Sequence, residues 1–202
     1  MDIYQFLDFA GTFVFAISGV RVAAEKKMDI FGAIIIGFAS AIGGGTIRDL
    51  LLGATPVSWI QNSEYLYLIV SAVVIGILFD RYIFELKNML LIFDSIGLGV
   101  FTLAGMQKAI NYGIDTEYAV ILGITTATAG GIIRDILANE VPLILQKEIY
   151  ATACFAGALI YLLLEYLNVN YHYNSFITII FIVVLRTFAV KYNIAFPSLR
   201  KE

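Results

Sequence analysis

Long apolar stretches separated by short polar segments run through the whole chain. Several come close to the roughly 20 residues that an α-helix needs to cross the hydrocarbon core of a bilayer. The pattern therefore predicts an all-α membrane protein with seven transmembrane helices. We place these helices at Ile3–Val22, Ile30–Leu52, Tyr65–Phe79, Met89–Gln107, Tyr118–Ala138, Ile149–Leu164 and Phe176–Val190.

The composition of the chain supports this pattern. Hydrophobic residues make up 60% of the 202 positions and charged residues 14%, and the mean hydropathy is +0.86. A soluble domain of this composition would expose too much apolar surface to water. The connections between the stretches are short, so we expect a single membrane domain over residues 1–202.

The basic residues outside the predicted spans, or within one residue of their ends, are strongly segregated. If seven spans alternate in direction, only Lys108 falls on one side of the membrane, and all the others share the opposite side. Because Lys and Arg collect in cytoplasmic loops, we expect an external N-terminus and a cytoplasmic C-terminus in the inner membrane of the cell. The basic residues assigned to the cytoplasm are Arg21, Lys26, Lys27, Arg81, Lys87, Lys147, Lys191, Arg200 and Lys201.

A motif in the second predicted span recurs in the fifth. Gly43–Asp49 (GGGTIRD) returns 86 residues later as Ala129–Asp135 (AGGIIRD), and the same shift superposes several glycines and a proline. The chain therefore contains an internal repeat. We predict two three-helix repeats, at residues 3–80 and 88–166, and an extra helix at 174–190. Because each repeat has an odd number of spans, the second copy must be inverted relative to the first.

The repeat also duplicates charged residues within the predicted spans. In the inverted arrangement one charged set lies toward the outer surface and the other toward the inner surface. A charge that faces lipid is costly, so these side chains should meet inside the protein or in a hydrated cavity. We expect Asp8 to pair with Arg48 and Asp94 with Arg134, and an excess of acids to favour cations. The full set of candidate pore and gating residues is Asp8, Arg48, Asp49, Asp94, Arg134 and Asp135.

Glycine clusters precede both Arg-Asp pairs. Each glycine weakens a helix by about 1 kcal/mol relative to alanine, so we expect helices two and five to kink or break there. In the first copy, Thr46 and Asp49 have the spacing of a capping pair for a new half-helix. In the alternative interpretation, the glycines are contact surfaces for neighbouring helices. The candidate kink residues are Gly43, Gly44, Gly45, Gly130 and Gly131.

The duplicated GGGTIRDLLLG and AGGIIRDIL motifs in a small seven-span chain resemble the prokaryotic members of the trimeric intracellular cation (TRIC) channel family. The resemblance covers both repeats and the last helix. It implies a homotrimer in which each protomer has its own pore between the two kinked helices. It also implies that monovalent cations permeate, mainly K⁺ but also Na⁺, and that Arg48 and Arg134 take part in gating.

Other functions are less consistent with the sequence. We expect no enzyme, because the chain has no H-E-x-x-H, G-x-S-x-G or P-loop motif. With one histidine and one cysteine, we expect no metal site and no cofactor. The expected partners are the lipid bilayer and further copies of the chain, with no nucleic acid. The main alternative is a secondary transporter of a small amino acid such as glycine, because transporters also use inverted repeats.

One further basic residue lies within a predicted span. Arg186 is close to the end of the last span and to Lys191. We expect its side chain to extend to the cytoplasmic surface rather than to enter a pore.

Overall fold

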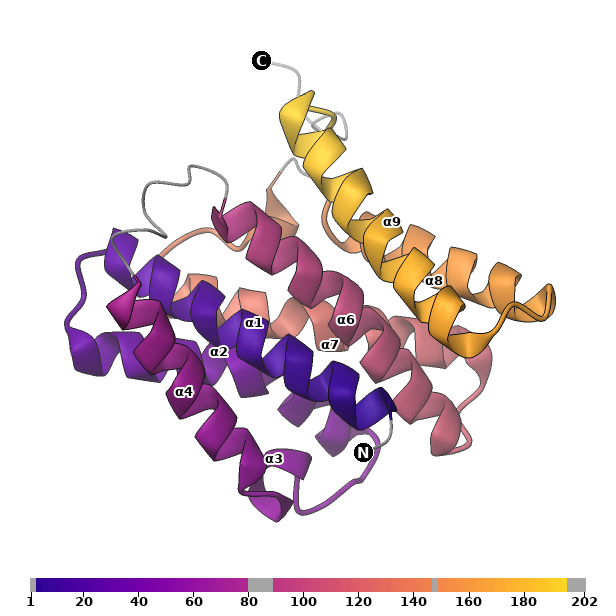
Figure 1. Ribbon diagram of the computed structural model, residues 1–202, viewed down its shortest axis with the longest axis horizontal. Helices are drawn as coiled ribbons and strands as arrows, with labels where there is room; N and C mark the ends of the chain where they lie inside the picture. Colours follow the sequence, from indigo (N-terminus) through magenta and orange to yellow (C-terminus); the bar gives the residue numbers. More distant parts are fainter. Residues whose placement is uncertain (1–2, 80–88, 147–148, 196–202) are drawn as a thin grey trace.

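The computed structural model describes residues 3–79, 89–146 and 149–195, and apart from an isolated bridge residue at Ala195 all regular structure in these ranges is helical. Figure 1 shows the helices packed around a centre formed by α1, α2, α6 and α7. The helices are α1 (Ile3–Glu25), α2 (Ile30–Leu51), α3 (Ser58–Gln61), α4 (Glu64–Leu78), α6 (Met89–Asn111), α7 (Thr116–Leu137), α8 (Ala151–Tyr166) and α9 (Tyr171–Lys191), with a 3₁₀ helix η1 (Leu143–Leu145).

The predicted all-α membrane fold is confirmed. Within the described ranges, α1, α2, α6, α7 and α9 are long and apolar enough to cross a membrane. The two remaining predicted spans correspond to α4 and α8, which are shorter apolar helices of 15 and 16 residues. The count of seven spans and the repeat limits stay predictions, and positions 80 and 88 lie outside the described residues. So do Arg81, Lys87, Lys147, Arg200 and Lys201, which the topology prediction used.

The distribution of polarity suits a bilayer. The buried interior contains arginines, aspartates, serines and threonines, whereas large apolar side chains cover much of the outside. A soluble protein rarely exposes apolar patches of this extent, but lipid tails solvate them. Examples of exposed apolar side chains on α2, α4, α8 and α9 are Ile30, Phe31, Ile34, Leu66, Val70, Val74, Phe155, Leu159, Phe176, Ile180 and Val184.

The two repeats meet along α1 and α6. The Phe15 ring stacks on the Phe101 ring with centroids 5.3 Å apart. These phenylalanines are equivalent in the two repeats, and their glycine neighbours are equivalent too. A Cβ on Gly11 would lie 2.9 Å from the Phe101 ring, and one on Gly97 would lie 3.0 Å from the Phe15 ring. This reciprocity places a pseudo-two-fold axis close to the stacked rings.

The peripheral helices lie outside this centre (Figure 1). Helix α4, which corresponds to the third predicted span, packs on α1, and α8 packs on α7 and α9. The extra helix α9 packs on α6 as well as on α8. One side of the central helices is therefore covered by a helix that has no counterpart in the repeat.

The expected breaks at the glycine clusters are wrong. Helix α2 is continuous through Gly43, Gly44 and Gly45, and α7 is continuous through Gly130 and Gly131. A glycine costs a helix about 1 kcal/mol, whereas an unsatisfied backbone group in a membrane costs several. Keeping the helical hydrogen bonds is therefore the cheaper solution. A kink in either helix axis stays a prediction.

The proposed cap at the end of the first cluster is also wrong. The Thr46 hydroxyl donates to the carbonyl oxygen of Ile42 in the preceding turn at 2.8 Å, and it accepts a 3.1 Å bond from Trp59 Nε1. Its carboxylate partner in the predicted cap, Asp49, binds other groups described below.

The glycines instead allow α2 and α7 to cross in close contact. A Cβ on Gly44 would lie 1.9 Å from the carbonyl oxygen of Thr126. In the equivalent position of the second repeat, a Cβ on Gly130 would lie 2.4 Å from the carbonyl oxygen of Ser40. Helix crossings in membranes use small residues in this way to bring two backbones together. The alternative interpretation, in which the glycines are contact surfaces for neighbouring helices, is therefore confirmed for Gly44 and Gly130.

Candidate functional site

The first charged cluster lies where the beginning of α1 meets the end of α2. Arg48 Nη1 donates to Asp8 Oδ1 at 2.8 Å, and Arg48 Nε donates to Asp49 Oδ1 at 2.8 Å. All three side chains are buried. One guanidinium therefore holds both carboxylates at once, and the predicted pairing of Asp8 with Arg48 is present.

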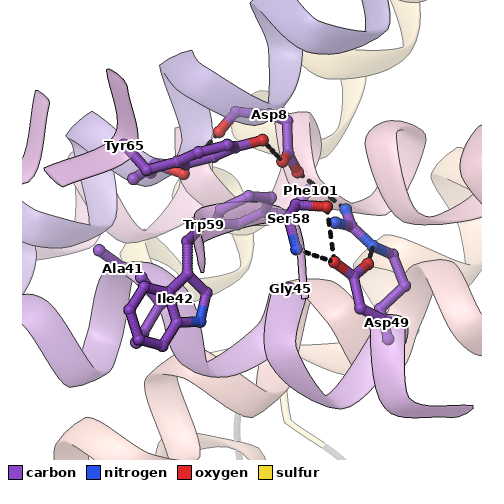
Figure 2. A pocket seen from close by; sticks show the side chains of 11 residues that line it. Asp8, Ala41, Ile42, Gly45, Asp49, Ser58, Trp59, Tyr65 and Phe101 are labelled. Atoms are coloured by element: carbon purple, nitrogen blue, oxygen red, sulfur yellow. Dashed lines mark hydrogen bonds and ion pairs between the residues drawn. The ribbon is translucent and has the colours of Figure 1, made fainter. Parts of the chain in front are cut away.

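Neutral groups complete the coordination of these carboxylates. Figure 2 shows Tyr65 beside Asp8 and Ser58 beside Asp49. The Tyr65 hydroxyl donates to Asp8 Oδ2 at 2.5 Å. The backbone N–H and the hydroxyl of Ser58 both donate to Asp49 Oδ2, at 2.8 and 2.6 Å. These bonds satisfy oxygens that would otherwise be buried without a partner, which is expensive in a membrane.

A lysine from the second repeat joins the first cluster. Lys108, in the last turn of α6, places its Nζ 2.7 Å from Asp49 Oδ1 and 2.6 Å from the Ser58 hydroxyl oxygen. The end of α6 therefore lies beside the beginning of α1, which carries Asp8, so α1 and α6 run antiparallel. An inverted repeat requires this arrangement.

The second cluster repeats the geometry of the first. Arg134 Nη1 donates to Asp94 Oδ1 at 2.8 Å, and Arg134 Nε donates to Asp135 Oδ1 at 2.9 Å. Arg134 Nη1 also donates to the hydroxyl of Ser18 on α1 at 2.6 Å. The backbone N–H of Leu143 caps Asp135 Oδ2 at 3.0 Å, as that of Ser58 caps Asp49. The predicted pairing of Asp94 with Arg134 is therefore present too.

The structure buries Arg186 inside the protein, beside the second cluster. Its side chain is only 1% exposed and lies 3.5 Å from Asp94 Oδ2. The guanidinium also covers the Tyr150 ring, with its central carbon 4.4 Å from the ring centroid. Burial against a carboxylate and an aromatic face holds this arginine in the protein. The predicted extension to the cytoplasmic surface is wrong.

The charge of the two clusters also differs from the prediction. Among the described residues, Asp8 and Asp49 face two cations, because Lys108 adds to Arg48. In the second cluster Arg186 adds to Arg134 in the same way, against Asp94 and Asp135. Each cluster is therefore balanced in this conformation. The expected excess of acids is wrong because both additional cations come from helices outside the local motif.

Cavities reach the two clusters from opposite ends of α1. A cavity of about 170 Å³ is lined by Gln5, Asp8, Arg48 and Lys108, among others. A second cavity of about 190 Å³ borders Arg134 and is also lined by Glu25 and Lys26 at the far end of α1, among others. At 1.5 Å per residue, the two ends of α1 lie about 30 Å apart. A smaller space of about 10 Å³ lies deeper in the first cluster (Figure 2).

An ion pair crosses the edge of the second cavity. Lys26, after α1, contacts Glu140, after α7. Both side chains are partly exposed, so this pair contributes little to stability. It does bring the connections that follow α1 and α7 together at the opening.

Comparison with known proteins identifies the family. The sequence model of a family described as "Glycine transporter" matches residues 5–81 and 91–166. A TRIC trimeric intracellular cation channel orthologue from Rhodobacter sphaeroides superposes with a TM-score of 0.89 at 32% identity, over 96% of this chain and 100% of that one. This chain belongs to the bacterial TRIC family. The resemblance predicted from the duplicated motif is therefore confirmed.

Bacterial relatives of this TRIC family member are membrane proteins. A UPF0126 inner membrane protein from Escherichia coli K12 is 39% identical over 194 residues, which cover 95% of this chain and 94% of the relative. A UPF0126 membrane protein from Vibrio cholerae is 46% identical over 154 residues, or 76% of this chain. The match spans 64% of the length of the Vibrio protein.

The sequence pattern missed several members of the TRIC clusters. Tyr65 and Tyr150 have the apolar character of interface or core residues, and Ser58 lies outside the predicted spans. Yet Tyr65 binds Asp8, and the Tyr150 hydroxyl donates to Asp94 at 3.3 Å. The one available signal was the position of Lys108, the single exception to the segregation of basic residues. A lysine on the predicted external side goes against the usual distribution of basic residues in membrane proteins, so it indicates a specific partner.

Proposed function

We propose that this protein forms a K⁺-permeable monovalent cation channel, with one pore in each protomer of a homotrimer. The observation that carries the proposal is the symmetric pair of buried Arg-Asp-Asp clusters, each bordered by its own cavity. Buried charges are rare in membrane proteins and concentrate along ion paths. Similarity to solved TRIC cation channels supports the same function.

The path that we propose passes between α2 and α7 and connects the two cavities. It narrows at the crossing of these helices, where Gly44 and Gly130 allow backbone contact. Arg48 and Arg134 are barriers to cations unless carboxylates neutralise them, and each already binds two. Gating then consists of a rearrangement of these bonds that widens the crossing. K⁺ and Na⁺ are the permeant ions, and no cofactor takes part.

The second candidate function is secondary transport of a small amino acid such as glycine. The description of the matching family as "Glycine transporter" favours it, and buried arginines suit a carboxylate ligand. A channel and a transporter differ in rate and saturation. Channels pass unitary currents, whereas a transporter shows slow solute flux that saturates and is subject to competition.

Purified protein in planar bilayers and in liposomes tests the proposal. We expect unitary currents carried by K⁺ and by Na⁺. We expect no flux driven by a glycine gradient. Arg48→Ala and Arg134→Ala should alter open probability or selectivity, because each removes a positive charge from the path. Saturable glycine uptake without unitary currents would favour the transporter over the channel. Unchanged gating and unchanged selectivity in both variants would exclude the two arginines from the gating mechanism.

We further propose that the chain lies in the inner membrane with its N-terminus outside and its C-terminus in the cytoplasm. The E. coli relative is an inner membrane protein, and the asymmetry of Lys and Arg sets the orientation. A phosphatase reporter, active only outside the cytoplasm, should be active after fusion to the N-terminus and inactive after fusion to the C-terminus. The reverse pattern would overturn the orientation.

A further inference from the structure

The ammonium of Lys108 occupies a small site made of oxygen atoms. Its Nζ lies 2.7 Å from Asp49 Oδ1 and 2.6 Å from the Ser58 hydroxyl. Asp49 itself is buried, and Ser58 directs its backbone N–H and hydroxyl toward the other carboxylate oxygen. A carboxylate and a hydroxyl fixed in this way would coordinate any small monovalent cation, because such ions exchange their water shell for protein oxygens.

Among the residues that the structure describes, this site has no counterpart in the second cluster. By the repeat register, the position equivalent to Lys108 is Val22. The group that matches Ser58 in capping the aspartate is Leu143, which has a backbone N–H but no hydroxyl. Val22 and Leu143 therefore supply neither the ammonium of Lys108 nor the hydroxyl of Ser58, and these are the two groups in contact with each other in the first cluster.

Lys108 and Arg186, the additional cations of the two clusters, also differ in how freely their side chains can move. The Lys108 side chain is 24% exposed and lines the cavity of about 170 Å³ next to Asn111 and Gln5. It is carried on a flexible four-carbon stem at the end of a helix. Arg186 in the second cluster is buried and packed over Tyr150. Lys108 can thus leave its carboxylate for the neighbouring cavity, whereas Arg186 is enclosed.

We propose that Asp49 and Ser58 form a binding site for a permeant monovalent cation, and that the Lys108 ammonium occupies this site as a tethered competitor. The proposal rests on the channel function. When Lys108 withdraws into the cavity, Arg48 faces two carboxylates and the first cluster carries one net negative charge. That charge attracts one cation to the place that the ammonium vacates. Lys108 therefore limits the occupancy of the site by K⁺.

A binding measurement tests the site independently of conduction. Lys108→Met and Lys108→Gln remove the ammonium and keep a side chain of similar length. In detergent, KCl should raise the melting temperature of both variants by a few degrees, relative to N-methylglucamine chloride at equal ionic strength. The native protein should shift less, and Ser58→Ala combined with Lys108→Met should lose most of the shift. Lys191→Met, at an exposed lysine, should match the native protein.

Flux measurements test the competition. At low K⁺ concentration, the K⁺ flux of Lys108→Met should exceed the native flux several-fold. Methylammonium should then inhibit the flux of this variant more strongly than that of the native protein, because it replaces the missing lysine head group. An equal response of native and variant protein to methylammonium would overturn the competition.

The outcomes separate this inference from the channel proposal. K⁺-dependent stabilisation of Lys108→Met without unitary currents would support the cation site and reject the channel. Unitary currents together with equal K⁺ shifts in native and Lys108→Met protein would support the channel and overturn the site.

Discussion

Replacing Arg134 with alanine is expected to lower the free energy of unfolding by about 3–5 kcal/mol, the usual cost of breaking a buried ion pair on one side. Arg134 is fully buried and binds Asp94, Asp135 and Ser18. Without it, Asp135 keeps only the backbone N–H of Leu143 among the contacts described above. Arg186 remains beside Asp94, but at 3.5 Å its contact is longer. Reversible unfolding in mixed micelles measures the change.

The equivalent variant of the first cluster is the matched comparison. Arg48→Ala should cost less, about 1–3 kcal/mol, because Lys108 still neutralises Asp49 and the neighbouring cavity of about 170 Å³ admits water to Asp8. Adding Asp135→Asn to Arg134→Ala should recover part of the loss, since it removes the uncompensated charge. Equal losses for the two arginines, or no recovery in the double variant, would contradict this account of the clusters.

Replacing Gly44 with alanine is expected to destabilise the protein by about 3 kcal/mol, the upper part of the range for overpacked cores, and to abolish K⁺ flux. The new Cβ would lie 1.9 Å from the carbonyl oxygen of Thr126. That neighbour is backbone of α7, so no side chain can rotate to make room. The two helices would have to separate at their crossing. Thermal unfolding in detergent and K⁺ flux from liposomes measure the two effects.

Neighbouring glycines supply the controls for this experiment. A Cβ on Gly45 would meet only Arg48 Nη2, at 3.6 Å, an ordinary contact. Gly45→Ala should therefore be neutral, or stabilising by up to about 1 kcal/mol through helix propensity. Gly130→Ala should resemble Gly44→Ala, because its Cβ would lie 2.4 Å from the carbonyl oxygen of Ser40. Loss of stability in Gly45→Ala equal to that in Gly44→Ala would contradict the steric explanation, because alanine favours the helix at both positions and only Gly44 faces the backbone of α7.

The long apolar stretches and the duplicated motif were sufficient to predict the all-α membrane fold, the family and the two arginine–aspartate pairs. Each of these depends on local sequence or on the repeat register. A charged side chain within an apolar span has very few acceptable neighbours in a membrane. When the same charges recur in register, the choice of partner narrows to Asp8 for Arg48 and Asp94 for Arg134.

Two features depended on contacts between distant segments. One is whether α2 and α7 stay continuous at their glycines, and the other is which side chains belong to each charged cluster. Whether Gly44 breaks a helix or admits a neighbour depends on the approach of α7, which local propensity does not encode. Lys108 and Arg186 reach their aspartates from helices 59 and 92 residues away in sequence. Long flexible side chains can find partners in many directions, so only the packing of the helices determines which carboxylate each one meets and how the charges balance.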